Sequence, residues 1–109
     1  MLDLGLGGKV AIITGGSEGL GRAAARRLAA EGARVAICAR RPDVLERAAA
    51  GIRAAGGQVL ARPVDVTKAD QIETFVSEVV REWGGVDILV NNAGTSAAAS
   101  FEAVDDAAW

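Results

Sequence analysis

A glycine-rich segment, residues 14–21, has the residue types and spacing that could bind phosphate groups. Its glycines follow the pattern G-x-x-x-G-x-G rather than the commoner G-x-G-x-x-G. One glycine lets the chain turn off a strand, a second lets backbone approach a pyrophosphate, and a third lets a helix pack close to the sheet. The N–H groups of the helix start then favour the phosphates. An ordinary glycine-rich turn is the alternative.

Two arginines, Arg40 and Arg41, follow the second apolar run, about 20 residues beyond the glycines. An acidic residue there would bind the ribose 2′-hydroxyl of NAD, whereas arginine accommodates the 2′-phosphate of NADP. We therefore expect NADP, with NAD as the alternative, and we place Arg40 at the phosphate, which Arg41 could share. Asp43 could take the acidic role, and the charge of Glu18 would repel a nearby phosphate. Two solvated loop arginines are the structural alternative.

Small polar residues follow the two remaining apolar runs. The block Asn-Asn-Ala-Gly at 91–94 comes after the fourth run. Ligands of doubly wound sheets bind outside the carboxyl ends of the strands, so these residues leave room for a cofactor ribose. A turn that uses Asn and Gly in left-handed conformations is the alternative. Asp65 and Val66, after the third run, indicate either a carboxylate near an adenine amino group or only a turn into a helix.

Short apolar runs alternate with longer amphipathic stretches along the chain. Strands are expected at residues 10–13, 34–39, 59–66 and 86–90, and helices at 20–31, at 43–55 and along an apolar stripe at 72–83. Thr67 is expected to cap the third helix, with Asp70 three residues on, and Pro63 indicates an edge strand or a strand end. This β-α-β-α-β-α-β order predicts an α/β, doubly wound parallel sheet with strand order 3-2-1-4, whose fourth strand is an unprotected edge.

Composition narrows the function classes. The 109 residues carry a net charge of −2 and no clustered basic residues, so we expect one domain and no nucleic-acid partner. No segment resembles a signal peptide or a membrane span. Cys38 is the single cysteine and histidine is absent, which argues against a disulfide or zinc site and fits a cytoplasmic protein. Tyrosine is also absent, so these residues cannot complete a mechanism that uses Tyr or His.

Taken together, the TGxxxGxG element, the Asp65-Val66 pair and the Asn-Asn-Ala-Gly block resemble the short-chain dehydrogenase/reductase family across nearly all 109 residues. Residues 8–11 and 35–40 are similar to 3-oxoacyl-(acyl-carrier-protein) reductase-like members. The resemblance implies a Rossmann-type sheet and hydride transfer between NAD(P)H and a carbonyl or alcohol, with Thr14 bracing the strand ends. The expected cofactor contacts are Gly15, Ser17, Glu18, Gly19, Leu20, Arg40, Arg41, Asp65, Val66, Asn91, Ala93 and Gly94.

The chain departs from the family in lacking its catalytic residues. A Tyr, a Lys in a Y-x-x-x-K spacing, a Ser and an Asn on the next helix would all lie beyond Trp109. We therefore expect residues 1–109 to be the cofactor-binding N-terminal part of a homo-oligomeric reductase of small carbonyl or alcohol substrates. A helix that opens at Asp105 and is not completed favours this expectation. The alternatives are a stand-alone, non-catalytic nucleotide-binding or interaction module, and a Rossmann-like methyltransferase, against which the Asn-Asn-Ala-Gly block argues.

Overall fold

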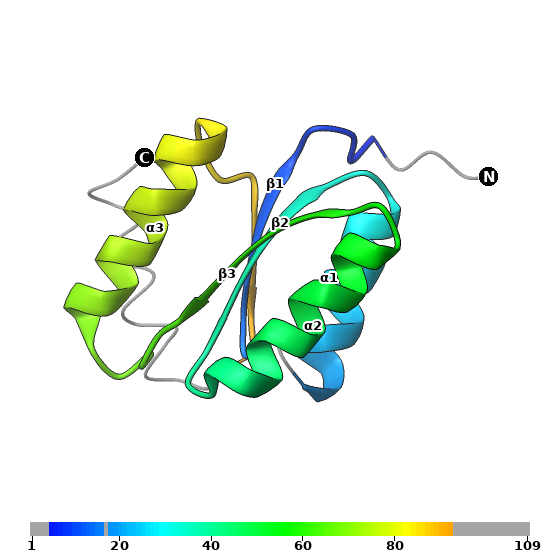
Figure 1. The fold of residues 1–109 in the computed structure, drawn as a ribbon. Coiled ribbons are helices and arrows are strands. Elements are labelled where there is room, and N and C mark those ends of the chain that lie inside the picture. Colours follow the sequence, from blue (N-terminus) through cyan, green and yellow to red (C-terminus); the bar gives the residue numbers. More distant parts are fainter. Residues whose placement is uncertain (1–4, 17, 93–109) are drawn as a thin grey trace.

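The computed structural model describes residues 5–16 and 18–92, in which strands and helices alternate strictly. The strands are β1 (Val10–Thr14), β2 (Arg34–Ala39), β3 (Gln58–Pro63) and β4 (Ile88–Asn91), and the helices are α1 (Gly19–Ala30), α2 (Pro42–Ala54) and α3 (Ala69–Trp83). All strand pairs are parallel, in the order β3-β2-β1-β4 (Figure 1). The predicted doubly wound sheet and its 3-2-1-4 order are therefore confirmed.

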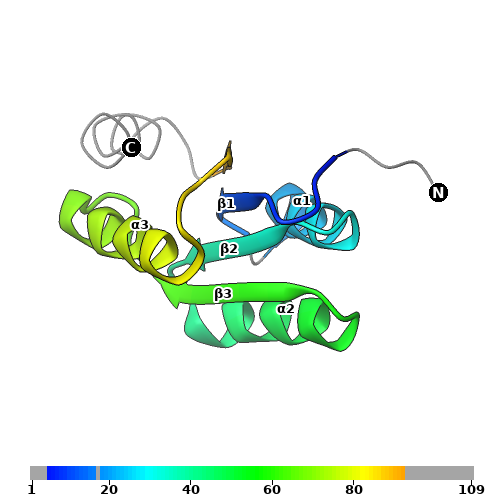
Figure 2. The ribbon, with the colours of Figure 1, turned by 90° about the horizontal axis from the view of Figure 1, so that it is seen from above.

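The sheet separates two apolar cores. Figure 2 shows α3 on one face of the sheet and α1 with α2 on the other. Successive side chains of a strand point to opposite faces, so in β1 Ile12 packs in the core with α3 and Ile13 packs in the core with α2. Every residue of β1 is buried, as predicted for a strand covered on both faces.

Helix α3 packs through the apolar stripe that the sequence predicts. Ile72, Phe75, Val76 and Val79 are buried, and Trp83 packs partly buried at the end of the stripe. Each such side chain contributes roughly 1.5–3 kcal/mol when fully buried, so this stripe anchors the α3 layer. Gly84 ends the helix in the left-handed conformation, with φ of 87°.

The expected cap of α3 is wrong. The helix begins at Ala69, its N-cap is Lys68, and no side chain caps it. The Thr67 hydroxyl instead donates to Asp65 Oδ1 at 2.6 Å, and the Thr67 N–H donates to the same oxygen at 3.0 Å. A short Asp side chain competes well for nearby backbone and hydroxyl donors, so Thr67 belongs to the turn before the helix.

Several element boundaries also differ from the sequence prediction. Strand β3 ends at Pro63 and lies at the sheet edge, which confirms the interpretation of Pro63 but shortens the expected strand. Strand β4 begins at Ile88, because Asp87 exchanges two bonds with Val10: its N–H donates to the Val10 carbonyl, and its Oδ2 accepts from the Val10 N–H. Helices α1 and α2 each begin and end one residue earlier than expected.

Two further expectations concern the exposed edge at β4 and the presence of membrane-spanning helices. Strand β4 lies at the edge of the described sheet, and Leu89 on it is 44% exposed, in agreement with the expected apolar edge. No helix among the described residues combines the length and apolar character that a membrane span requires.

Cys38 provides a test of this packing. Its side chain is completely buried in the α3-side core, and burial raises the pKa of its thiol to about 12. Because the thiolate is the reactive form, we expect a disulfide reagent at pH 8 to leave Cys38 unmodified in the folded chain and to modify it fully in guanidinium.

The same shift makes stability depend on pH. The unfolded thiol loses its proton above about pH 8.5 while the folded thiol keeps it, so the free energy of unfolding should fall as the pH rises through that range. Urea titrations at pH 7.5 and 9.5 measure this fall in the free energy of unfolding. Rapid stoichiometric labelling under native conditions would contradict the burial of Cys38.

Candidate functional site

The polar segments singled out by the sequence meet at one end of the sheet. The glycine segment follows β1, the two arginines follow β2, Asp65 follows β3, and Asn92 follows β4. Parallel strands place their carboxyl ends at the same edge, so the topology itself gathers these segments. Ser17, Ala93 and Gly94, which were also expected here, lie outside the described residues.

The glycines take the three positions expected of a phosphate-binding turn. Gly15 leaves β1 with φ of +67°, a conformation that glycine adopts without strain. A Cβ added at Gly19 would meet no atom within 4 Å, so this stretch of backbone is open to a ligand. A Cβ added at Gly21 would overlap the Gly15 carbonyl oxygen, so Gly21 lets α1 start directly against the end of β1.

A further glycine and a leucine complete this turn. A Cβ added at Gly16 would lie 2.7 Å from Ile37 Cγ2, so Gly16 is also required by packing, a constraint that the motif spacing did not indicate. Leu20 at the start of α1 is 80% exposed, which leaves an apolar side chain beside the open backbone of Gly19. The turn therefore combines backbone donors with one apolar contact surface.

Thr14 joins the ends of β1 and β4. Its side chain is fully buried, its Oγ1 donates to Asn91 Oδ1 at 3.0 Å, and it accepts from the Asn92 N–H at 2.8 Å. These two bonds fix where the Asn-Asn segment leaves the sheet. Thr14 thus braces the strand ends, as the family resemblance implies.

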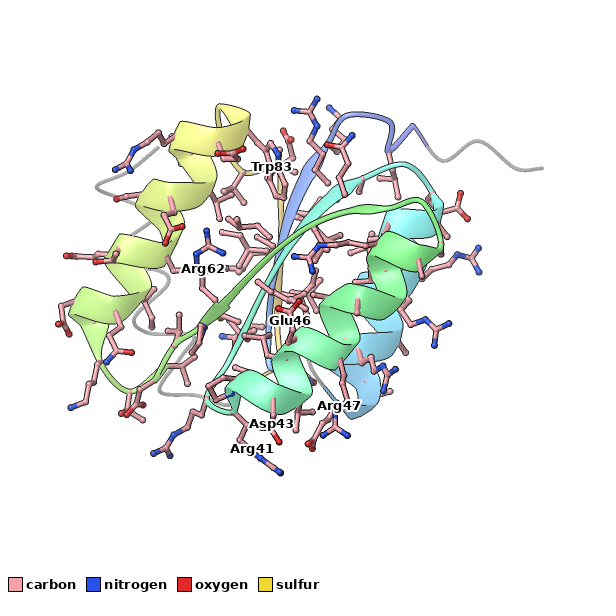
Figure 3. All side chains as sticks on the ribbon, in the orientation of Figure 1. Arg41, Asp43, Glu46, Arg47, Arg62 and Trp83 are labelled. Carbon is pink, nitrogen blue, oxygen red and sulfur yellow. The ribbon has the colours of Figure 1, made fainter. Side chains whose placement is uncertain are left out.

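Arg41 lies in a chain of ion pairs beside the glycine segment. Its guanidinium is 3.8 Å from the Glu18 carboxylate and 4.0 Å from that of Asp43, which in turn is 3.7 Å from Arg47. Figure 3 shows Arg41, Asp43 and Arg47 gathered at the beginning of α2. All four side chains are largely exposed, so each pair contributes well under about 1 kcal/mol and can rearrange around a ligand.

Glu18, Arg41 and Arg47 line a shallow pocket of about 490 Å³ between the starts of α1 and α2. Val44 was not expected in this lining from the sequence, and neither were two arginines, Arg22 and Arg47. Helical geometry could have indicated them, because Arg22 lies one turn after Gly19 and Arg47 lies one turn after Asp43. The full lining is Glu18, Gly19, Arg22, Arg41, Val44 and Arg47.

Arg40 lines a different pocket, on the β3 side. This hollow of about 190 Å³ is formed by Arg40, Pro63, Val64, Asp65 and Gln71. The Thr67 hydroxyl and N–H lower the pKa of the Asp65 carboxyl, with smaller contributions from Arg40 and Lys68, so Asp65 is ionised at neutral pH. The Asp65 N–H donates to Gln71 Oε1 at 2.8 Å, and Val66 packs partly buried against the α3-side core.

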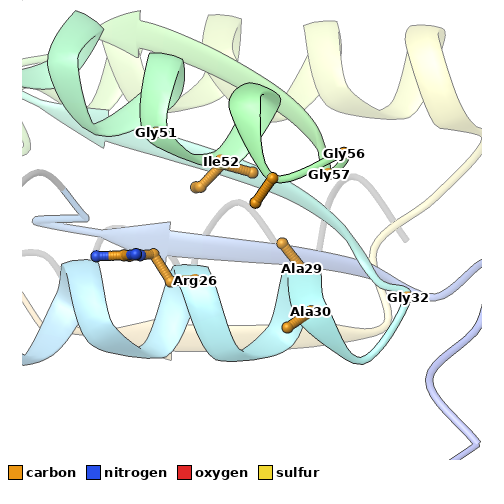
Figure 4. A pocket seen from close by; sticks show the side chains of 9 residues that line it. Arg26, Ala29, Ala30, Gly32, Gly51, Ile52, Gly56 and Gly57 are labelled. Atoms are coloured by element: carbon orange, nitrogen blue, oxygen red, sulfur yellow. The ribbon is translucent and has the colours of Figure 1, made fainter.

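Another hollow lies at the opposite end of the sheet. It measures about 330 Å³ and is lined mainly by small residues of α1, α2 and the turns that follow them (Figure 4). Arg26 is its one charged lining residue, and none of the strand-end residues reaches it. Among the residues that the structure describes, no group of three His, Cys, Asp or Glu side chains could hold a metal ion. The strand-end region therefore remains the candidate site.

A family model described as short chain dehydrogenase matches residues 9–109. The chain belongs to the short-chain dehydrogenase family. A relative from Bacillus subtilis, 2,3-dihydro-2,3-dihydroxybenzoate dehydrogenase, is 37% identical over 105 residues, which are 96% of this chain and 40% of the relative.

Solved structures of this family show the same fold. L-sorbose reductase from Gluconobacter frateurii, complexed with NADPH and L-sorbose, has a TM-score of 0.81 and 45% identity over 86% of this chain and 36% of its own. Actinorhodin polyketide ketoreductase with NADPH has a TM-score of 0.76 and 44% identity over 80% of this chain and 33% of its own. This short-chain dehydrogenase sequence thus spans well under half the length of these relatives.

Two glycine substitutions test the packing of the glycine segment. Gly21→Ala should destabilise the chain by about 1–3 kcal/mol, because the new Cβ forces α1 away from the Gly15 carbonyl. Gly51→Ala is the matched control: Gly51 lies within α2, its Cβ would meet nothing within 4 Å, and the change should stabilise the chain by about 0.5–1 kcal/mol. Urea unfolding followed by circular dichroism measures both, and equal stabilities would refute the close approach.

Proposed function

We propose that this chain is the cofactor-binding part of an NADP-dependent oxidoreductase, which in a longer protein transfers hydride between NADPH and a carbonyl or alcohol substrate. The observation that carries the proposal is the convergence of an open glycine turn and two arginines at the carboxyl edge of a parallel sheet. The two relatives solved with NADPH, a sorbose reductase and a ketoreductase, support the same cofactor and substrate class.

The residues of the chain have separate tasks in this proposal. The N–H groups at the start of α1 bind the pyrophosphate, because they have no intrahelical partners and carry partial positive charge. Gly19 leaves the room that a phosphate needs, while Leu20 contacts the cofactor through its exposed apolar surface. NADPH, when bound, supplies the hydride.

The remaining expected contacts follow the cofactor along the strand ends. The ionised Asp65 accepts a hydrogen bond from the adenine amino group, with Val66 beside the ring. On the other side of the turn, Asn91, Ala93 and Gly94 line the second ribose, and Ser17 binds within the glycine segment. Thr14 positions the Asn91 end of this path through its two hydrogen bonds.

The 2′-phosphate of NADP is assigned to the two arginines. Arg40 approaches from the adenine side and Arg41 from the glycine side, since they line different pockets at the same edge. No carboxylate occupies the position of Arg40, which favours NADP over NAD. Glu18 opposes this preference, because its carboxylate lies 3.8 Å from the Arg41 guanidinium and repels a phosphate there.

Cofactor fragments test this assignment on the chain itself. By calorimetry we expect 2′,5′-ADP to bind about tenfold more tightly than 5′-AMP, equivalent to about 1.5 kcal/mol for one screened charge-assisted contact. Arg40→Ala should remove most of that preference and leave 5′-AMP binding nearly unchanged. It should also make the affinity for 2′,5′-ADP less dependent on salt concentration. Equal binding of the two fragments by the unmutated chain would refute the NADP assignment and would make Asp43 the residue to test as a ribose ligand.

Glu18→Gln provides the variant with the opposite effect. Removing its charge should strengthen 2′,5′-ADP binding about two- to fivefold at low salt, because Arg41 no longer shares its charge with a carboxylate. Asp43→Asn is the control, and it should act more weakly because Asp43 is also paired with Arg47.

We further propose that these 109 residues alone do not reduce carbonyl compounds. The family's proton donor is a Tyr whose pKa, near 10 in water, is lowered by a neighbouring Lys, and the sequence contains no Tyr. NADPH oxidation followed at 340 nm with a panel of aldehydes and ketones should therefore equal the rate without protein. Turnover by a preparation shown to contain no other reductase would overturn this proposal.

A cytoplasmic location and a homo-oligomeric longer protein complete the proposal. The single, buried Cys38 fits a reducing compartment, where nicotinamide-dependent reductions take place. Membership of the family supports self-association of the longer protein. The 109 residues have a net charge of −2 and no long run of basic residues, which argues against a nucleic-acid partner.

A further inference from the structure

Strand β3 presents an open edge whose backbone groups can be assigned. The Val64 N–H donates to the Ala39 carbonyl of β2 at 2.9 Å, so at Val64 the backbone faces into the sheet. Backbone groups alternate in direction along a strand, and therefore those of Ala61 and Pro63 face outward. An open edge of this kind can pair with a strand of another chain.

Arg62 occupies part of this edge. Its Nη1 donates to the outward-facing Ala61 carbonyl at 2.8 Å, and its Nε donates to Glu78 Oε2 of α3, also at 2.8 Å. Figure 3 shows Arg62 between β3 and α3. Because the guanidinium is a rigid planar fork, two bonds to different partners restrict its orientation at this edge.

The geometry distinguishes this pair from the ion pairs around the glycine segment. The Arg41 and Arg47 contacts with carboxylates are 3.7–4.0 Å long and lie between largely exposed side chains. Glu78 is only 32% exposed and Arg62 44% exposed, and the 2.8 Å separation is that of a charge-assisted hydrogen bond. Arg62 is thus held by short bonds, whereas Arg41 and Arg47 are not held by theirs.

Pro63 removes the next group that an incoming strand would need. It lies at an outward-facing position of β3, and proline has no N–H to donate. At the carboxyl end of β3, the acceptor of Ala61 is therefore occupied and the donor of residue 63 is absent. The neighbouring Val59, Leu60 and Ala61 are half-buried apolar residues, so an unguarded edge here would be prone to pairing.

We propose that Arg62, Glu78 and Pro63 form an edge guard that keeps β3 from pairing with β3 of a second copy of this chain. The excluded arrangement is an antiparallel pair about a two-fold axis, which would join the two sheets edge to edge. This inference concerns self-association of the fold and is independent of the proposed function.

The experiment compares association states of folded variants by sedimentation. Arg62→Ala combined with Pro63→Thr restores a free acceptor and a donor, and self-association should become about tenfold tighter than in the unmutated chain. Glu78→Ala keeps Arg62 but releases it from α3, and should give a smaller shift in the same direction. Arg27→Ala is the matched control, because Arg27 forms a 3.1 Å pair with Glu31 at the end of α1, a helix that packs on β1 and β2, and it should change nothing.

Amide hydrogen exchange locates any association. The proposal expects concentration-dependent protection at residues 58–63 in the double variant, with circular dichroism showing that the fold is retained. It is overturned if folded Arg62→Ala/Pro63→Thr and folded Glu78→Ala both remain in the association state of the unmutated chain. It is also overturned if the new protection appears at residues 88–91, or if the unmutated chain itself associates through residues 58–63.

Discussion

The close approach of α1 to the end of β1 is the constraint on which the rest of this structure depends. It exists because Gly21 has no side chain to collide with the Gly15 carbonyl. The helix can therefore begin directly above the strand, so that its free N–H groups face the carboxyl edge of the sheet. A larger residue in place of Gly21 would shift α1, and with it Gly19, Leu20 and the ion pair of Glu18 with Arg41.

At this edge of the sheet, buried contacts hold the backbone in place, whereas the charged side chains are exposed to solvent. Thr14, Gly16 and Gly21 are buried, and they fix backbone positions through close packing and hydrogen bonds. The arginines, by contrast, sit on the surface in long, screened ion pairs that cost little to rearrange. Under the proposed function, the buried residues would hold the turn in place and the exposed arginines would set the cofactor preference, so fold stability and cofactor preference would depend on different residues.

The sequence predicted the features that depend on local spacing. Apolar runs, helical stripes and glycine positions specified all seven elements, because each pattern reflects a periodicity of the backbone itself. The candidate residues that the structure describes lie at the strand ends, as the sequence predicted, since parallel strands gather their carboxyl ends at one edge. Assignment of those residues to the cofactor remains a prediction, and Ser17, Ala93 and Gly94 lie outside the described residues.

The sequence did not predict which of several possible partners a side chain would contact. Thr67 is a residue type that often caps helices, but its hydroxyl donates to the Asp65 carboxylate instead. Arg40 and Arg41 are adjacent in sequence but line different pockets, because Arg41 has the extended backbone of a helix N-cap and side chains of extended neighbours diverge. Arg62 and Glu78 come from different elements, so their contact follows only from the packing of α3 beside β3.

That last contact shows how one arginine can differ in role from another of the same charge. Arg41 shares its charge between two carboxylates at 3.8 and 4.0 Å and makes no short bond, so a phosphate can compete for it. Arg62 makes two bonds of 2.8 Å to one carboxylate and one carbonyl, and a competing anion would have to break both. Geometry, rather than charge, therefore separates an arginine that is available to a ligand from one that is committed to the fold.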